Sequence, residues 1–111
     1  MEQVEILLRI RNRLSKEEGI DDSFLFEAIT TIEDRLNLRL NSDVLPKRFE
    51  SILVDAVVKL WRRQYYEGIS TERIDMIQTT FVDNILDEYD KEIQSYNSQS
   101  SGPAVNVVRF I

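Results

Sequence analysis

The residues best suited to chemistry lie in an acidic run, DNILDEYDKE at 83–92. Carboxylates at this density can bind divalent cations or form an acid–base pair. An EF-hand loop would need glycine at its sixth position, where this run has Glu88. Asp83 and Asp87 share one helix face, as do Glu88 and Glu92, so the run predicts a solvated acidic helix face instead of a metal site.

A basic run, RIRNRLSK at 9–16, is the second candidate. By their spacing, Arg9, Arg13 and Lys16 lie on one side of a helix and would suit phosphate or an acidic partner surface. The whole chain, however, has 20 acidic and 14 basic side chains and a net charge of -6. This balance argues against a broad nucleic-acid or membrane surface, which would need a basic face.

The residue types that carry most enzymatic chemistry are absent or scarce. The chain has no histidine and no cysteine, which removes the usual general base and the thiolate ligands of metal sites. Three glycines can hardly supply a phosphate-binding loop, and no nucleophile-elbow motif occurs. No apolar stretch reaches the roughly 18–20 residues of a membrane span. We therefore predict a protein that is not an enzyme, with no cofactor, no metal and no membrane partner.

Hydrophobic spacing predicts two helices in the first part of the chain. The second follows Asp21 or Asp22, either of which suits an N-cap because a carboxylate accepts from the unpaired N–H groups of the first turn. It should end near NLRLNSD at 37–43. The predicted apolar face of the first helix consists of Val4, Leu7, Leu8 and Leu14, widened by Ile6 and Ile10, and that of the second consists of Leu25, Ala28, Ile29, Ile32 and Leu36.

The longest apolar stripe follows Pro46, which suits the first turn of a helix because its missing N–H has no partner there. We predict a third helix that runs to about Tyr66, forms the centre of the core and ends in a break at Gly68. Its inward residues are Phe49, Ile52, Leu53, Ala56, Val57, Leu60 and Trp61.

The last part of the chain gives two different patterns. RIDMIQTTF at 73–81 partly alternates, which favours a short strand or an extended loop. VDNILDEYDKEIQSY at 82–96 predicts a last helix. The predicted fold class is therefore all-α, a small bundle of about four helices with an extended C-terminal arm. The inward residues of the last helix are Ile85, Leu86, Tyr89, Ile93 and Tyr96.

We divide the chain into a helical bundle domain at 1–96, a flexible linker at 97–103 and an extended partner-binding arm at 104–111. The linker is polar, and the arm is rich in valine, which favours an extended backbone. The arm is either a disordered or folded-back end, or a strand that pairs with the sheet of a neighbour. The candidate partner-binding residues are Ala104, Val105, Asn106, Val107, Val108, Arg109, Phe110 and Ile111.

Three stretches resemble the head–tail connector (adaptor) proteins of tailed double-stranded DNA phages. DDSFLFEAITTIEDRLN at 21–37 is similar to the acid-capped second helix of that family. LPKRFESILVDAVVKLWRRQYYEGIST at 45–71 is similar to its long central helix and the break that follows, and TTFVDNILDEYDKEI at 79–93 to its last helix. TERIDMI at 71–77 departs from the usual Ser-rich pattern.

The resemblance implies a structural protein of the virion, located at the head–tail interface after synthesis in the host cytoplasm. Copies of the chain would form a ring, commonly twelve-fold in the family, beneath the portal protein. DNA would pass through the ring without sequence-specific binding, and the next neck or stopper protein would dock below. In related connectors the C-terminal segment reaches the portal, a role that falls on residues 104–111 here.

Two other functions remain open on the residues alone. One is a generic helical interaction module, such as an assembly chaperone or a regulatory adaptor. The other is a small DNA-binding regulator, although no predicted helix carries the polar outer face of a recognition helix.

Overall fold

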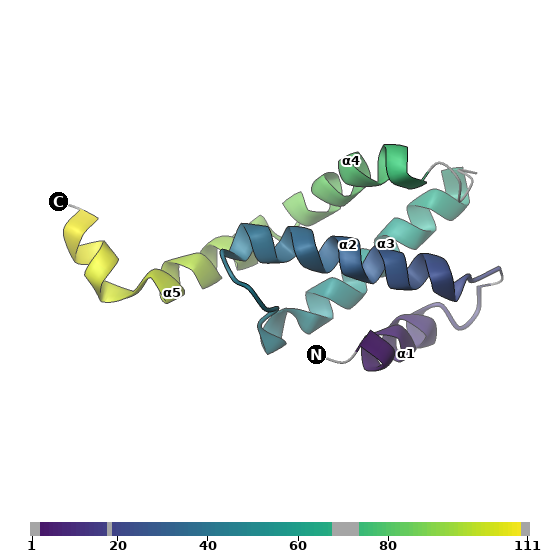
Figure 1. Cartoon of the computed structure of the whole chain (residues 1–111), viewed down its shortest axis with the longest axis horizontal. Coiled ribbons are helices and arrows are strands. Elements are labelled where there is room, and N and C mark those ends of the chain that lie inside the picture. The colour runs from purple at the N-terminus through teal and green to yellow at the C-terminus, as the bar shows by residue number, and fades with distance from the viewer. Residues whose placement is uncertain (1–2, 18, 68–73, 110–111) are drawn as a thin grey trace.

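The computed structural model of the chain describes residues 3–17, 19–67 and 74–109. These residues form five α-helices and one short 3-10 segment, and they contain no strand, which confirms the predicted all-α class (Figure 1). The elements are α1 (Gln3–Arg13), α2 (Asp22–Leu40), the 3-10 segment η1 (Lys47–Phe49), α3 (Glu50–Glu67), α4 (Ile74–Asp87) and α5 (Asp90–Arg109).

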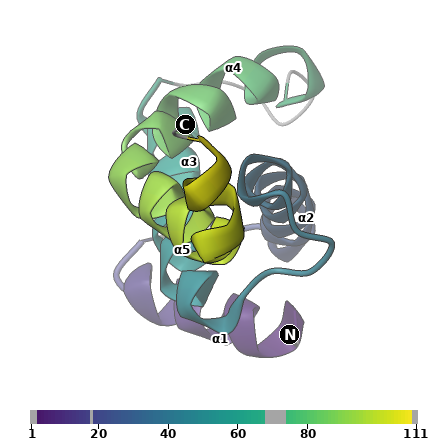
Figure 2. The same cartoon turned by 90° about the vertical axis from the view of Figure 1, so that its left-hand side faces the viewer.

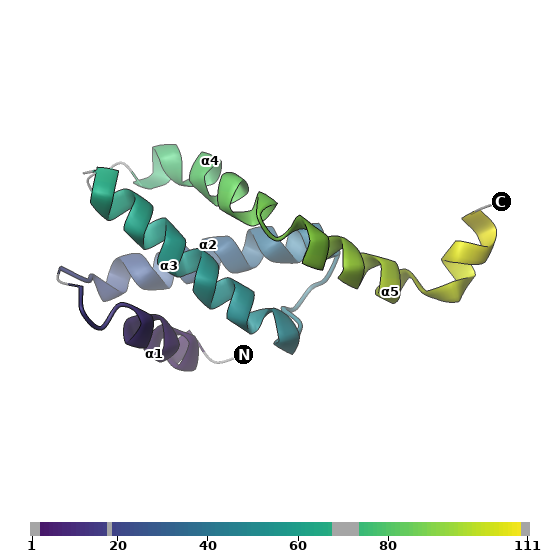
Figure 3. The same cartoon turned by 180° about the vertical axis from the view of Figure 1, so that it is seen from behind.

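The helices surround a central pair. α2 packs on α3, while α1 lies on one side of this pair and α4 on the opposite side (Figures 1 and 3). Figure 2 looks along the molecule from the end at which α5 projects, and it shows α5 beside α2 with α4 above and α1 below. Because α5 continues past the end of the bundle, the molecule is elongated and measures 53 × 27 × 20 Å.

The core follows α3 and α2, as predicted. Trp61 is only 5% exposed, which places it in the core as predicted. Burying side chains of this size stabilises the fold by about 1.5–3 kcal/mol each, before the entropic cost of ordering them. The predicted core positions that are buried on these two helices are Leu25, Ala28, Ile29, Ile32, Leu36, Leu53, Ala56, Val57, Leu60 and Trp61.

Both ends of α2 are capped, the first by a side chain and the last by backbone N–H groups. Asp21 is the N-cap, and its carboxylate accepts a hydrogen bond of 2.9 Å from the N–H of Ser23. At the other end Asn41 takes the left-handed conformation with φ of 54°, and the N–H of Ser42 reaches back to the carbonyl of Asn37 at 3.1 Å. These bonds pair backbone groups that have no partner inside the helix, so α2 ends sharply.

The first helix packs through only part of the predicted face, because Leu7 and Leu14 are buried as predicted but Val4 and Leu8 are not. Ile6 and Ile10 are buried, whereas Val4 and Leu8 are 59% and 57% exposed. At helical spacing, the stripe through Val4 and Leu8 continues to Arg11. The stripe through Ile6 and Ile10 continues to Leu14. Turning Ile10 inward therefore avoids burying a guanidinium group, which explains the outcome.

The strand or loop predicted at 73–81 is wrong, because residues from Ile74 onward belong to α4. Ile74, Ile77, Phe81 and Ile85 also recur at helical spacing. A helix pairs its own backbone groups, whereas a strand here would have no second strand to pair with among the described residues. The predicted break at Gly68 lies outside the described residues.

The last helix, predicted as one, is divided at Glu88 and Tyr89. Their N–H groups bond to the carbonyls of Ile85 and Leu86 at 3.1 and 3.0 Å, a tight turn that ends α4 before α5 begins. The predicted inward face is otherwise confirmed, because Ile85, Leu86, Tyr89 and Ile93 are buried.

The structure has residues 97–109 in α5, where the sequence predicted a flexible linker and the start of an extended arm. Phe110 and Ile111 lie outside the described residues. A helix already formed from Asp90 extends without a new nucleation cost, although Gly102 and Pro103 inside it oppose helix formation by about 1 and about 3 kcal/mol relative to alanine. Pro103 removes one helical hydrogen bond, and α5 changes direction in its last turns (Figures 1 and 3).

Candidate partner-binding site

The end of α5 carries the predicted partner-binding residues away from the core. Ile93 is buried and Tyr96 is half-buried, and Ser98 and Gln99 beyond them are exposed. At a helical rise of 1.5 Å per residue, residues 97–109 extend the helix by about 20 Å. The candidate positions 104–109 therefore lie on a projecting helical end (Figures 1 and 3).

The direction of α5 is fixed at the turn between α4 and α5 by two residues of α3. The phenol of Tyr89 donates a hydrogen bond to Asp55. Nζ of Lys59 donates to Oε1 of Glu88 at 2.5 Å and lies 4.9 Å from the centroid of the Tyr89 ring. The turn is thus bound to the middle of α3 through one hydrogen bond from a phenol to a carboxylate and one ion pair.

The charges at this turn shift one another's protonation. The hydrogen bond to Glu88 raises the pKa of Lys59 above its ordinary value of 10.5, against a smaller opposing effect of burial. Burial, followed by the hydrogen bond to Asp55, raises the pKa of Tyr89 to about 12. At neutral pH Lys59 is therefore charged and Tyr89 keeps the proton that it donates.

Arg39 holds the same turn from the side of α2. Its Nη1 donates to Oδ1 of Asp87 at 3.0 Å and lies 3.5 Å from Oδ1 of Asp90, so one guanidinium bridges the end of α4 and the start of α5. Its Nη2 donates to the backbone carbonyl of Asp83 at 3.3 Å, and its own carbonyl accepts from Nδ2 of Asn97 at 2.9 Å. The acidic run is thus exposed but largely paired.

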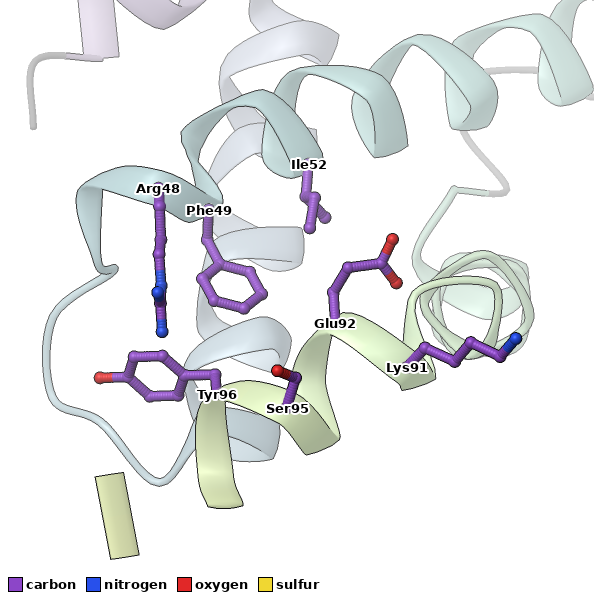
Figure 4. Close-up of a pocket in the computed structure, with 7 residues that line it drawn as sticks. All are labelled: Arg48, Phe49, Ile52, Lys91, Glu92, Ser95 and Tyr96. Atoms are coloured by element: carbon purple, nitrogen blue, oxygen red, sulfur yellow. The ribbon is translucent and has the colours of Figure 1, made fainter. Parts of the chain in front are cut away.

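A groove opens on the other side of α5, between that helix and the start of α3 (Figure 4). Phe49 and Tyr96 meet edge to face, with ring centroids 5.4 Å apart and an interplanar angle of 86°. The guanidinium of Arg48 lies 5.1 Å from the centroid of the Tyr96 ring. The groove has a volume of about 420 Å³ and is lined by Arg48, Phe49, Ile52, Lys91, Glu92, Ser95 and Tyr96.

This groove, which we call the α3–α5 groove, was not predicted from the sequence. Its residues come from two segments, 48–52 and 91–96, that are separated by most of α3 and all of α4. Each segment by itself shows only ordinary helical spacing. The sole signal was that the aromatic residue Tyr96 stands at the last inward position of the predicted helix.

The basic run serves contacts within the chain. Nη1 of Arg9 lies 3.7 Å from Oε1 of Glu50, and Nη2 of Arg13 donates to Oδ1 of Asp55 at 2.8 Å. The side chain of Lys16 is exposed. Two of the three aligned cations are thus paired with α3, which leaves little of the phosphate-binding surface that the run alone would offer.

Neither a metal-ligand cluster nor a membrane-spanning helix is present among the described residues. They contain no group of three or more Asp, Glu, His or Cys side chains placed to hold a metal ion. No helix within the same residues combines the length and apolar content that crossing a bilayer requires.

Comparison with known proteins gives one match. A family model described as "Phage gp6-like head-tail connector protein" matches residues 1–97, which include all three stretches that carry the resemblance. Neither the comparison with curated proteins nor that with solved structures finds a similar protein. The family is one of structural proteins that join phage head and tail. Because the match spans most of the 111 residues, the chain belongs to the phage gp6-like head-tail connector family.

Proposed function

We propose that this chain is the subunit of a ring that lies beneath the portal protein of a phage and extends the channel for DNA. Its membership of a connector family supports a place at the junction of head and tail. The net charge of -6 suits a wall past which DNA slides, because it repels phosphate and disfavours stable binding. In this proposal the ring presents a further surface to the next neck or stopper protein.

The observation that carries the proposal is the projecting end of α5. The turns of α5 that follow the contacts of Asn97 and Gln99 continue the helix beyond the bundle, and the sequence is apolar at four of the six positions 104–109. An apolar segment on such a projection is suited to bury itself on a second protein. We infer that residues 104–111 contact the portal as a helix at least up to Arg109, and not as an added strand.

The test is a binding measurement between the chain and purified portal rings. We expect the double variant Val105→Asp, Val108→Asp to bind about tenfold more weakly or worse, because burying a carboxylate in an apolar contact costs more than the roughly 1.4 kcal/mol that a factor of ten represents. The matched control is Val4→Asp, Leu8→Asp, which places the same charges on the exposed face of α1.

Equal portal affinity for the wild type and the α5 variant would contradict the role of residues 104–111. If the wild-type chain itself failed to bind portal rings at any concentration tested, the proposed place beneath the portal would be wrong.

A further inference from the structure

A second surface lies at the end of α2, and we call it the α2 edge: Asp34, Leu38, Asp43 and Val44. Leu38 and Val44 are 70% and 72% exposed, more than Val4 and Leu8 on α1. Asp34 lies one turn before Leu38 on the same helix face, and Asp43 adjoins Val44. Neither acid forms a salt bridge with another described residue.

Local hydrogen bonds hold the α2 edge in place. The hydroxyl of Ser42 donates to the carbonyl of Val44 at 2.5 Å and accepts from its N–H at 3.3 Å. The next residue, Leu45, is buried and anchors the loop to the core. Val44 is therefore presented outward from a fixed backbone, which lowers the entropic cost of docking it on a partner.

The α3–α5 groove has the complementary character. Its apolar floor is formed by Phe49, Ile52 and Tyr96. The charged residues that line it are two cations, Arg48 and Lys91, and one acid, Glu92, so it has an excess of one positive charge (Figure 4). Lys91 forms no salt bridge with another described residue. The α2 edge complements this groove, because it offers exposed apolar side chains, each beside a carboxylate, to an apolar floor whose charged residues are on balance positive.

The two surfaces lie on different sides of α5. The hydrogen bond from Asn97 to the carbonyl of Arg39 places one side of α5 against α2, whereas the bond from Arg48 to Gln99 places another side against the start of α3. Figure 2 shows α2 and the loop that follows it beside α5, with the start of α3 below. The α2 edge therefore does not fill the groove of its own chain.

We propose that the α3–α5 groove receives the α2 edge of a second copy of this chain. The contact joins two unlike surfaces, so every copy offers one edge and one groove. Repeating such a contact produces a closed ring when the rotation between neighbours closes, and an open filament when it does not. This inference rests on the proposed ring function and names the surfaces through which neighbours would meet.

Cysteine trapping tests the contact, because the chain has no cysteine of its own. Oxidation of the double variant Val44→Cys, Ser95→Cys should give a ladder of dimers, trimers and larger species. A mixture of the two single variants should give mainly mixed dimers and no larger species. The matched control combines Val44→Cys with Ser15→Cys, since Ser15 is exposed but lies away from the groove, next to α1.

Charge reversal tests specificity in the same experiment. We expect Asp43→Lys in the edge-bearing single variant, or Lys91→Glu in the groove-bearing one, to lower the yield of mixed dimers severalfold. The two reversals together should restore much of the yield, because opposite charges face each other again.

Two results would overturn the inference. One is a double variant that forms no more ladder than the Ser15 control. The other is that Val44→Cys homodimers match mixed dimers in yield, which would indicate a symmetric contact. Portal binding in the earlier assay separates the two proposals, because a missing ladder with intact portal binding rejects only the edge-and-groove contact.

Discussion

The phenol of Tyr89 donates a hydrogen bond to the carboxylate of Asp55, which ties the turn between α4 and α5 to the middle of α3. The other carboxylate oxygen accepts from Nη2 of Arg13 at 2.8 Å, and Nζ of Lys59 lies 3.4 Å from the oxygen that Tyr89 contacts. Asp55 thus joins α1, α3 and the turn. Since α5 starts directly after Tyr89, the direction of its projecting end depends on this carboxylate.

Replacing Asp55 should make the stability of the fold less dependent on pH. Burial raises the pKa of Asp55, but hydrogen bonds from Tyr89 and Arg13 and the charges of Lys59 and Arg13 together hold it below the ordinary 3.8. A carboxylate with a lowered pKa stabilises the fold above about pH 4, and this contribution is lost as the pH falls through the folded-state pKa. We expect Asp55→Asn to cost about 1–2 kcal/mol at pH 7.

Urea unfolding at pH 7 and near pH 3 measures this difference. The difference in the free energy of unfolding between wild type and Asp55→Asn should be smaller at the lower pH. The control Asp43→Asn, at an exposed acid, should unfold like the wild type at both pH values. A gap of equal size at both pH values would mean that the ionised carboxylate is not what stabilises the turn.

Tyr89 should titrate separately from an ordinary tyrosine. Its pKa is raised to about 12, from 10.0, by burial and by the bond to Asp55. Because the pKa of Tyr89 is higher in the folded than in the unfolded chain, the neutral phenol stabilises the fold fully below pH 10. That stabilisation falls as the pH rises towards 12. The phenolate absorbance of wild type minus that of Tyr89→Phe should rise near pH 12, and a rise centred on pH 10 would contradict the buried hydrogen bond.

Arg39 should contribute more to stability than its neighbour on the same helix. Its guanidinium is only 26% exposed and faces three carboxylates, so we expect Arg39→Met to cost about 1–2 kcal/mol at low salt and less at high salt. The matched control is Arg35→Met, because Arg35 forms no salt bridge with a described residue. If urea unfolding gave the same loss in the free energy of unfolding for both variants, the salt bridges of Arg39 across the turn would add nothing to stability.

The packed face of α1 can be checked by truncating one residue on each side. Ile10 is fully buried, so Ile10→Ala should cost about 2–4 kcal/mol through lost burial and the cavity that remains. Leu8 is exposed, so Leu8→Ala should change the free energy of unfolding by less than about 0.5 kcal/mol. A larger loss of stability for Leu8→Ala than for Ile10→Ala would contradict this packing of α1.

These cases show which parts of the fold were predictable from the sequence. The core face of α3 was predictable, because no other apolar stripe in the sequence is as long. The face of α1 was predicted only in part, since Val4 and Leu8 are as apolar as Ile6 and Ile10, and only Arg11 beyond Leu8 and the packing on α2 and α3 distinguish the two stripes. The salt bridge of Arg39 with Asp87 joins residues far apart in the chain, and no local spacing signals it.

The helical state of residues 97–109 gives the last prediction. Proline inside a helix costs about 3 kcal/mol relative to alanine, so Pro103→Ala should strengthen the end of α5 and raise the helical signal in far-ultraviolet circular dichroism. Pro46→Ala is the control, because Pro46 precedes η1 and lies outside any helix interior, so no rise is expected there. If residues 97–109 were an extended arm, Pro103→Ala would leave the helical signal unchanged, and so would deleting the arm. The portal contact would then have to be made by a strand, and a helical partner surface would be the wrong one to look for.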